Sequence, residues 1–163
     1  MSAIATPQGA AQDETLASLH EQARSLFAGE RDATANAANL AALIFHALPD
    51  LNWAGFYWLR GAELVLGPFQ GKPACVRIAL GKGVCGTAAS DRRTVVVPDV
   101  HAFPGHIACD SASNSEIVIP VVKGAQLLGV LDLDSPRLSR FDAEDARALE
   151  ELVAVFVAAT DFP

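Results

Sequence analysis

Two consecutive apolar segments near the end of the sequence constrain the fold more than any other feature. Residues 116–122 and 126–134 are rich in Val, Ile and Leu, and Lys123-Gly124 between them is typical of a hairpin turn. Successive side chains of a strand point to opposite faces of a sheet. In the second segment one face is expected to carry Leu127, Gly129, Leu131 and Leu133, and the other Leu128, Val130, Asp132 and Asp134. Two carboxylates therefore project from one face of a predicted central strand.

Apolar residues recur at helical spacing towards both ends of the chain. The first such segment covers residues 13–27. A second helix is expected to begin with Asp32 as its N-cap and to stop at Pro49, which cannot continue a helix. The last helix is expected to begin at Asp142, and its apolar positions recur through Phe156.

Between these helices the sequence is typical of strands. Aromatic and β-branched residues are frequent, and Gly61 is expected to form a hairpin turn. The expected strands cover residues 53–59, 63–66, 74–80 and 94–97. Two helices, five or six mostly antiparallel strands and a final helix predict an α+β domain in which helices cover a sheet.

The composition is that of a packed globular protein, with 51% hydrophobic and 19% charged residues. We expect one domain over residues 13–163, preceded by a flexible tail of residues 1–12. The net charge of −7 argues against nucleic acids and anionic membranes as partners, because both attract basic surfaces. No apolar run is long enough for a membrane span and the N-terminus does not resemble a signal peptide, so we expect a cytoplasmic protein.

Residues 98–115 follow neither a strand nor a helix period and are dense in turn-forming residues, which predicts a long loop. Phe103, Ile107 and Cys109 within this central loop favour burial, so we expect the loop to be ordered. Cys109 lies close in sequence to histidine and carboxylate side chains, and Glu116 opens the following strand. A thiol, the imidazole of His106 and carboxylates converging on an ordered loop indicate a functional site.

The chain has three cysteines, an odd number that fits a structural disulfide framework poorly. The spacing of Cys75, Cys85 and Cys109 matches no common zinc pattern, so no metal is expected, although a site of three thiols and His106 stays open. Cys85 lies among glycines and fits a buried apolar role better than Cys109 does. A reactive thiolate at Cys109 with Cys75 in reach would allow oxidation to a sulfenate and then disulfide closure.

Asp132 and Asp134 are unusual residues for a strand, and their apolar neighbours on the same face indicate partial burial. Like charges held close in a partly dry site raise one another's pKa. Such carboxyl groups can donate a proton near neutral pH or bind a substrate ammonium group. Trp53 and Tyr57 share one strand face and are candidates for an apolar pocket wall, although aromatic residues are more often core.

Several segments resemble the family of free methionine-(R)-sulfoxide reductases, which are single-domain enzymes of the GAF fold. The most specific are Gly67-Pro-Phe-Gln-Gly-Lys-Pro-Ala-Cys75, Gly81-Lys-Gly-Val-Cys85-Gly-Thr-Ala, Phe103-Pro-Gly-His-Ile-Ala-Cys109-Asp and Ser115-Glu-Ile-Val. Further segments are Gly29-Glu-Arg-Asp32, Ala47-Leu-Pro-Asp-Leu-Asn-Trp53 and Val130-Leu-Asp-Leu-Asp-Ser135. The resemblance runs from about residue 20 to residue 158, with no departure at a functional position.

This resemblance implies a thiol-dependent reduction of free L-methionine-(R)-sulfoxide to methionine, without a cofactor. Cys109 is then the nucleophile that becomes a sulfenate, and Cys75 resolves it as an intramolecular disulfide. Cys85 is implied as an alternative or relay thiol. The resemblance also implies thioredoxin as the reductant and a homodimer as the assembly.

The resemblance further implies that Glu116, Asp132 and Asp134 bind the substrate ammonium group and help to protonate the sulfoxide oxygen. Trp53 and Tyr57 are then expected to pack on its methyl and thioether groups. Two other functions stay open: a GAF module that senses a small ligand without turnover, and a thiol peroxidase. Three cysteines around an acidic pocket favour the reductase over the sensor, and the paired strand carboxylates favour it over the peroxidase.

Overall fold

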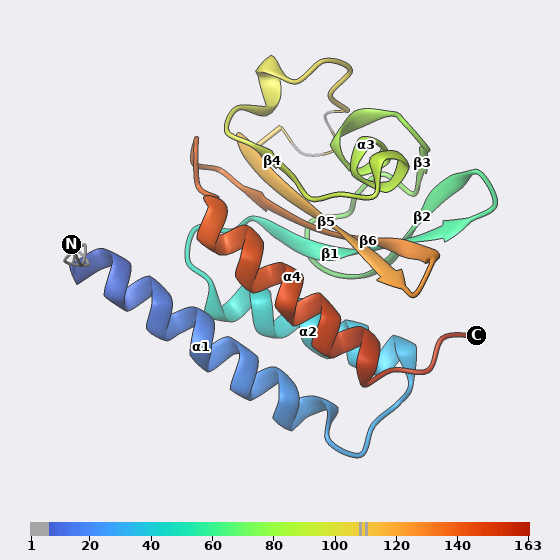
Figure 1. The fold of residues 1–163 in the computed structure, drawn as a ribbon. Helices are drawn as coiled ribbons and strands as arrows, with labels where there is room; N and C mark the ends of the chain where they lie inside the picture. The colour runs from blue at the N-terminus through green and yellow to red at the C-terminus, as the bar shows by residue number, and fades with distance from the viewer. Residues whose placement is uncertain (1–6, 108, 110) are drawn as a thin grey trace.

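The computed structural model describes residues 7–107, 109 and 111–163, and in it six strands form one sheet of antiparallel neighbours (Figure 1). Across the sheet the strand order is β3-β2-β1-β6-β5-β4. The elements along the chain are α1 (Pro7–Phe27), α2 (Ala33–Ala47), β1 (Trp53–Arg60), β2 (Glu63–Gly71), β3 (Arg77–Ala79), α3 (Gly83–Asp91), β4 (Val95–Val97), the 3-10 turn η1 (Val100–Ala102), β5 (Ser115–Lys123), β6 (Gln126–Ser135) and α4 (Ala143–Ala158). The predicted α+β class is confirmed.

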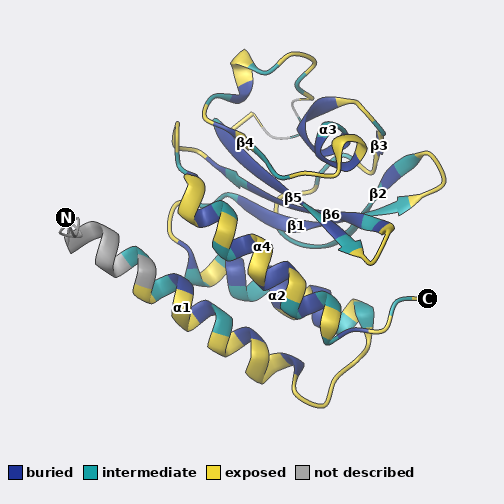
Figure 2. Cartoon of the chain, in the orientation of Figure 1, coloured by how far each residue is buried: buried dark blue, intermediate teal, exposed yellow. Residues whose placement is uncertain are grey.

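The helices divide between the two faces of the sheet. α1, α2 and α4 form a layer on one face, whereas α3 lies against the other face (Figure 1). The main apolar core fills the space between the sheet and the three-helix layer, where the Phe56 and Phe156 ring centroids lie 5.1 Å apart. A second apolar cluster lies on the α3 face and includes Trp53, Tyr57 and Cys85. Figure 2 shows the exposed sides of α1 and α4 turned away from the sheet.

Two predicted helix starts are confirmed by their capping bonds. The Asp32 carboxylate accepts a hydrogen bond from the backbone N–H of Ala35 at 2.8 Å, which satisfies one free donor at the start of α2. At the start of α4, Asp142 and Asp145 each accept a hydrogen bond from the other's backbone N–H, at 2.9 and 3.0 Å. Both helices therefore begin where the sequence places an acidic cap.

The first helix begins earlier than the sequence predicted. α1 starts at Pro7 instead of Asp13, so residues 7–12 of the expected tail are helical, and residues 1–6 lie outside the described residues. Proline is favoured in the first helical turn because its missing N–H has no partner there. The Gln12 side chain donates a hydrogen bond to the Asp145 carboxylate at 2.9 Å, which ties this turn to α4.

A β-bulge changes the predicted alternation along β6. The register between β5 and β6 shifts after Val121, so that Leu128 has no direct partner across the β5–β6 pair. Leu127 consequently lies with Val130 on the α3 face, and Leu128 packs against the main core. The predicted faces of Leu127 and Leu128 are therefore wrong, whereas the alternation is as predicted beyond the bulge.

Two strand boundaries around Cys75 also differ from the prediction. β2 continues to Gly71 instead of ending at Leu66, because residues 69–71 pair with residues 53–55 of β1. Pro68 is tolerated within this strand because β3 pairs with residues 63–65 and leaves the other side of Pro68 without a strand partner among the described residues. β3 is limited to Arg77–Ala79, so Cys75 lies in the preceding loop and not within a strand. This position leaves Cys75 free to approach the central loop.

Candidate active site

A small cavity lies on the α3 face of the sheet, beside the central loop. Its volume is about 50 Å³, which is room for a few water molecules. It is lined by seven of the eight residues predicted for the site, namely Trp53, Tyr57, Cys85, Cys109, Glu116, Asp132 and Asp134. The eighth, Cys75, is covalently bonded to Cys109. The structure therefore brings all of the predicted site residues to one place.

The carboxylates enter the cavity from two neighbouring strands. Glu116 of β5 lies directly opposite Asp134 of β6, and Asp132 is two residues earlier on the same strand and the same face. Glu116 and Asp132 are 6% and 5% exposed, whereas Asp134 is half-buried. Trp53 of β1 is paired with Asp134 on the other side of β6. An acidic centre thus adjoins an aromatic wall.

Burial and the repulsion among the three carboxyl groups favour the protonated form of Asp132. Burial raises the pKa of Asp132 well above its usual value, and the charges of Asp134 and Glu116 raise this pKa further. Asp132 therefore keeps its proton to a higher pH than an ordinary carboxyl group. Such a group can donate a proton to a ligand oxygen near neutral pH.

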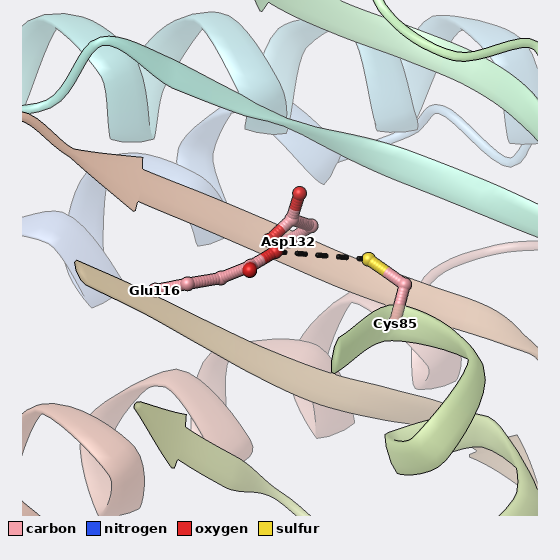
Figure 3. A group of neighbouring side chains, drawn as sticks. All are labelled: Cys85, Glu116 and Asp132. Atoms are coloured by element: carbon pink, nitrogen blue, oxygen red, sulfur yellow. Dashed lines mark hydrogen bonds between the residues drawn. The ribbon is translucent and has the colours of Figure 1, made fainter. Parts of the chain in front are cut away.

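Cys85 points from α3 towards the carboxylates (Figure 3). Its thiol donates a weak hydrogen bond to Glu116 Oε2, with a sulfur–oxygen distance of 3.9 Å. Burial, followed by the charges of Asp132 and Glu116, raises the pKa of the Cys85 thiol well above its usual value. At Gly86 a Cβ atom would meet the Ala79 carbonyl oxygen at 2.5 Å, so a glycine is needed for α3 to lie this close to β3.

Cys75 and Cys109 form a disulfide that joins the loop before β3 to the central loop, with their Cα atoms 5.6 Å apart. The Tyr57 hydroxyl donates a hydrogen bond of 2.8 Å to the Cys75 carbonyl oxygen and so holds this end of the bridge. Because Cys85 is the remaining free thiol and is buried, the three cysteines with His106 do not form a zinc site in this structure.

The aromatic wall is formed by stacked rings. The Trp53 ring centroid lies 5.9 Å from that of Tyr57 and 5.2 Å from that of Phe69. The indole N–H of Trp53 donates to the Lys72 carbonyl oxygen at 3.1 Å, which fixes the ring orientation. Trp53 and Tyr57 therefore belong to the apolar cluster on the α3 face and also line the cavity, as expected from the sequence.

Several cavity residues were not predicted or were given little weight. Lys82, Ile107 and Ser113 line the cavity without having been proposed, and His106, which was given little weight as a loop histidine, lines it as well. Ile107 closes over α3, since a Cβ atom at Gly83 would meet its side chain at 3.2 Å. The sequence signal that could have identified cavity residues was the position of His106 and Ile107 close to Cys109 in the central loop.

Comparisons with known proteins agree with this geometry. A family profile described as the GAF domain matches residues 34–161. The free methionine-R-sulfoxide reductase of Escherichia coli K12 is 52% identical over 91% of this chain and 92% of its own length. The structure of the Neisseria meningitidis free methionine-R-sulfoxide reductase in complex with its substrate has a TM-score of 0.86 at 46% identity, over 88% of this chain and 87% of that one. A Burkholderia vietnamiensis structure described as a candidate GAF sensor protein has a TM-score of 0.88 at 64% identity, over 91% and 94% of the two chains.

The fold and the matched profile define a GAF-domain protein. Within that class the chain belongs to the family of free methionine-R-sulfoxide reductases, which are oxidoreductases. In the part of the chain that the structure describes, no helix has the length and apolar character needed to cross a membrane.

Proposed function

We propose that this protein reduces free L-methionine-(R)-sulfoxide to methionine with its own thiols as the electron source. The observation that carries the proposal is the Cys75–Cys109 pair at disulfide distance beside a cavity lined by three carboxyl groups. The names of the Escherichia coli and Neisseria meningitidis relatives support the same substrate.

In the first step the Cys109 thiolate attacks the sulfoxide sulfur while a protonated carboxyl group gives its proton to the sulfoxide oxygen. The oxygen passes to the Cys109 sulfur, methionine leaves, and Cys109 becomes a sulfenic acid. The sulfoxide has then gained two electrons and the cysteine sulfur has lost two. Asp132 is suited to donate the proton because its pKa is raised by burial and by its acidic neighbours.

In the second step the Cys75 thiol attacks the Cys109 sulfenic acid, forms the disulfide and releases water. Thioredoxin then reduces the disulfide and restores both thiols. Cys85 serves as an alternative or relay thiol, and its contact with Glu116 instead of the disulfide favours a secondary role.

Substrate recognition is assigned to the acids and the aromatic wall. Glu116, Asp132 and Asp134 receive the α-ammonium group, which compensates the repulsion among buried carboxylates. Trp53 and Tyr57 pack on the methyl and thioether groups. We further propose that the protein works as a homodimer in the cytoplasm, where reductants maintain thiols.

The test couples methionine sulfoxide reduction to NADPH oxidation through thioredoxin and its reductase. The wild-type protein is expected to consume NADPH with the free R-sulfoxide, whereas Cys109→Ser, whose hydroxyl is a poor nucleophile towards sulfur, is expected to show no turnover. Wild-type activity in that variant would overturn the role of Cys109. Binding without turnover by the wild type would favour a ligand sensor, the function named for the Burkholderia vietnamiensis structure.

A further inference from the structure

We propose that the cavity also binds a divalent transition-metal ion such as Zn²⁺ through Cys85, Glu116 and Asp132. One ligand atom of each residue, the Cys85 sulfur and one oxygen of each carboxylate, lies within 4.8 Å of the other two. The three side chains converge from α3, β5 and β6 (Figure 3). A helix and the two strands of a later hairpin thus build one compact set of donor atoms.

The donor atoms fit zinc better than a hard cation. Zn²⁺ takes thiolate sulfur at about 2.3 Å and carboxylate oxygen at about 2.0–2.2 Å, usually in tetrahedral geometry. Two such ligands of one tetrahedral ion lie roughly 3.6 Å apart by these bond lengths. Cys85 Sγ and Glu116 Oε2 are 3.9 Å apart, so this pair needs a shift of only a few tenths of an ångström, and the Asp132 oxygen lies within 4.8 Å of both atoms. Calcium and magnesium prefer all-oxygen sites and gain little from the thiol.

An independent observation points to a missing partner at this position. Asp132 is 95% buried, and its Oδ1 atom has no hydrogen-bond partner within the described part of the chain. Buried polar atoms in folded proteins are almost always paired. Among residues 7–107, 109 and 111–163, no Lys or Arg forms an ion pair with Asp132 or Glu116. A bound cation would supply both the missing partner and the missing positive charge.

The space and the coordination number fit an exchangeable ion. The cavity of about 50 Å³ holds an ion together with a water molecule as its fourth ligand. Three protein ligands and a water in the fourth position are the pattern of catalytic zinc sites, whereas structural zinc is held by four protein ligands. Cys85 stays a thiol when Cys75 and Cys109 are bonded, so the donor set is complete in the oxidised protein.

Occupation of this site has a consequence that rests on the proposed function. The ion would take the carboxylates that we assign to the substrate ammonium group. Zinc and substrate would then exclude one another, and zinc would act as a reversible inhibitor. The site itself does not depend on the sulfoxide chemistry, so it is tested by binding alone.

The experiment titrates the oxidised wild-type protein, in which Cys85 is the single free thiol, with Co²⁺ as a spectroscopic replacement for Zn²⁺. We expect a near-ultraviolet thiolate-to-cobalt charge-transfer band that saturates at one Co²⁺ per chain and disappears when Zn²⁺ is added. Absence of the band would overturn the proposal.

Variants then test the three ligands. Cys85→Ser is expected to lose the band, and Glu116→Gln and Asp132→Asn to weaken binding on the order of a hundredfold, because even second-shell partners are worth about 10–100-fold. Glu63→Gln removes an equal charge at the surface pair with Arg77 and is expected to bind like wild type. Circular dichroism verifies that each variant is folded.

A band that persists in Cys85→Ser would overturn the site. So would unchanged affinity in a folded carboxylate variant. Neither outcome affects the proposed reductase function, because no turnover enters the measurement.

Discussion

Glu116 and Asp134 lie directly opposite each other on β5 and β6, so two carboxylates meet across one strand pair at the cavity. Like charges in this arrangement destabilise a sheet. Asp132, buried on the same face, adds a third carboxyl group, and its pKa is raised by burial and by both neighbours. The fold therefore tolerates an electrostatic strain that a cationic group bound in the cavity would relieve.

Replacing Asp132 by Asn is expected to stabilise the folded protein at neutral pH and to impair turnover. Because burial raises the pKa of Asp132 in the folded state, the unfolded chain loses this proton first as pH rises. The free energy of unfolding therefore decreases as pH rises from the usual Asp pKa of 3.8 to the higher pKa of Asp132 in the folded state. Asn removes this loss, and each kcal/mol recovered raises Tm by about 2–4 °C.

Thermal melts at neutral pH and below the usual Asp pKa measure this effect. The gain should be present at neutral pH and shrink in acid, where both states of the wild type hold the proton. Glu63→Gln, at an exposed ion pair, should change Tm little. A variant that melts below wild type at neutral pH would contradict the expected strain.

The sequence predicted the acidic centre because Asp132 and Asp134 follow the bulge in β6, where strand alternation is regular. It failed for Leu127 and Leu128 because a bulge depends on the pairing of two strands, which one strand's pattern does not contain. It also ended β2 too early, because whether Pro68 breaks a strand depends on how far the neighbouring strand extends.

The parts of the cavity that the sequence did not predict come from contacts between distant loops. Ser113 accepts a hydrogen bond from the Asn52 side chain at 3.0 Å, although 61 residues separate them. Ile107 lies over Gly83 of α3. Neither contact has a local periodic signal, so only the folded arrangement identifies these residues as cavity lining.

Substitution of Cys75 and substitution of Cys85 should have different effects on the reduction of the enzyme by thioredoxin. Cys75→Ser is expected to release one methionine per chain without reductant and to lose thioredoxin-driven turnover, because the disulfide partner of Cys109 is absent. Cys85→Ser should retain recycling. Methionine released per chain and steady-state NADPH oxidation measure the two steps. Unchanged steady-state activity in Cys75→Ser would transfer the resolving role to Cys85.

Tyr57→Phe is expected to slow disulfide closure. The variant keeps the ring in the aromatic wall but loses the hydrogen bond to the Cys75 carbonyl oxygen, a contribution of about 0.5–1.5 kcal/mol. The loop that carries Cys75 is then less well positioned. Quenched-flow counting of free thiols after one addition of sulfoxide measures closure. A closure rate equal to wild type would show that this hydrogen bond does not position Cys75.

The oxidised protein is expected to bind methionine sulfoxide much more weakly than a reduced form. With Cys75 and Cys109 bonded, the cavity has room for a few water molecules, which is less than the substrate needs. Calorimetric titration can compare oxidised wild type with Cys109→Ser, which cannot form this disulfide. Equal affinities would mean that the disulfide does not restrict the cavity.

The acidic centre should also make the enzyme select the free amino acid. A free α-ammonium group is a charged partner for Glu116 and Asp134, whereas a methionine within a polypeptide presents a neutral amide there. Leaving the buried Glu116 carboxylate without a cation costs on the order of several kcal/mol, which corresponds to a discrimination of roughly a thousandfold or more.

Comparison of kcat/KM for the free R-sulfoxide and for its N-acetylated, C-amidated analogue measures this preference. Asp134→Asn and Glu116→Gln should lower kcat/KM for the free substrate by more than Trp53→Phe, which keeps an apolar ring in the wall. Similar values for the two substrates would overturn the role of the carboxylates, even if Cys109 proves to be the nucleophile.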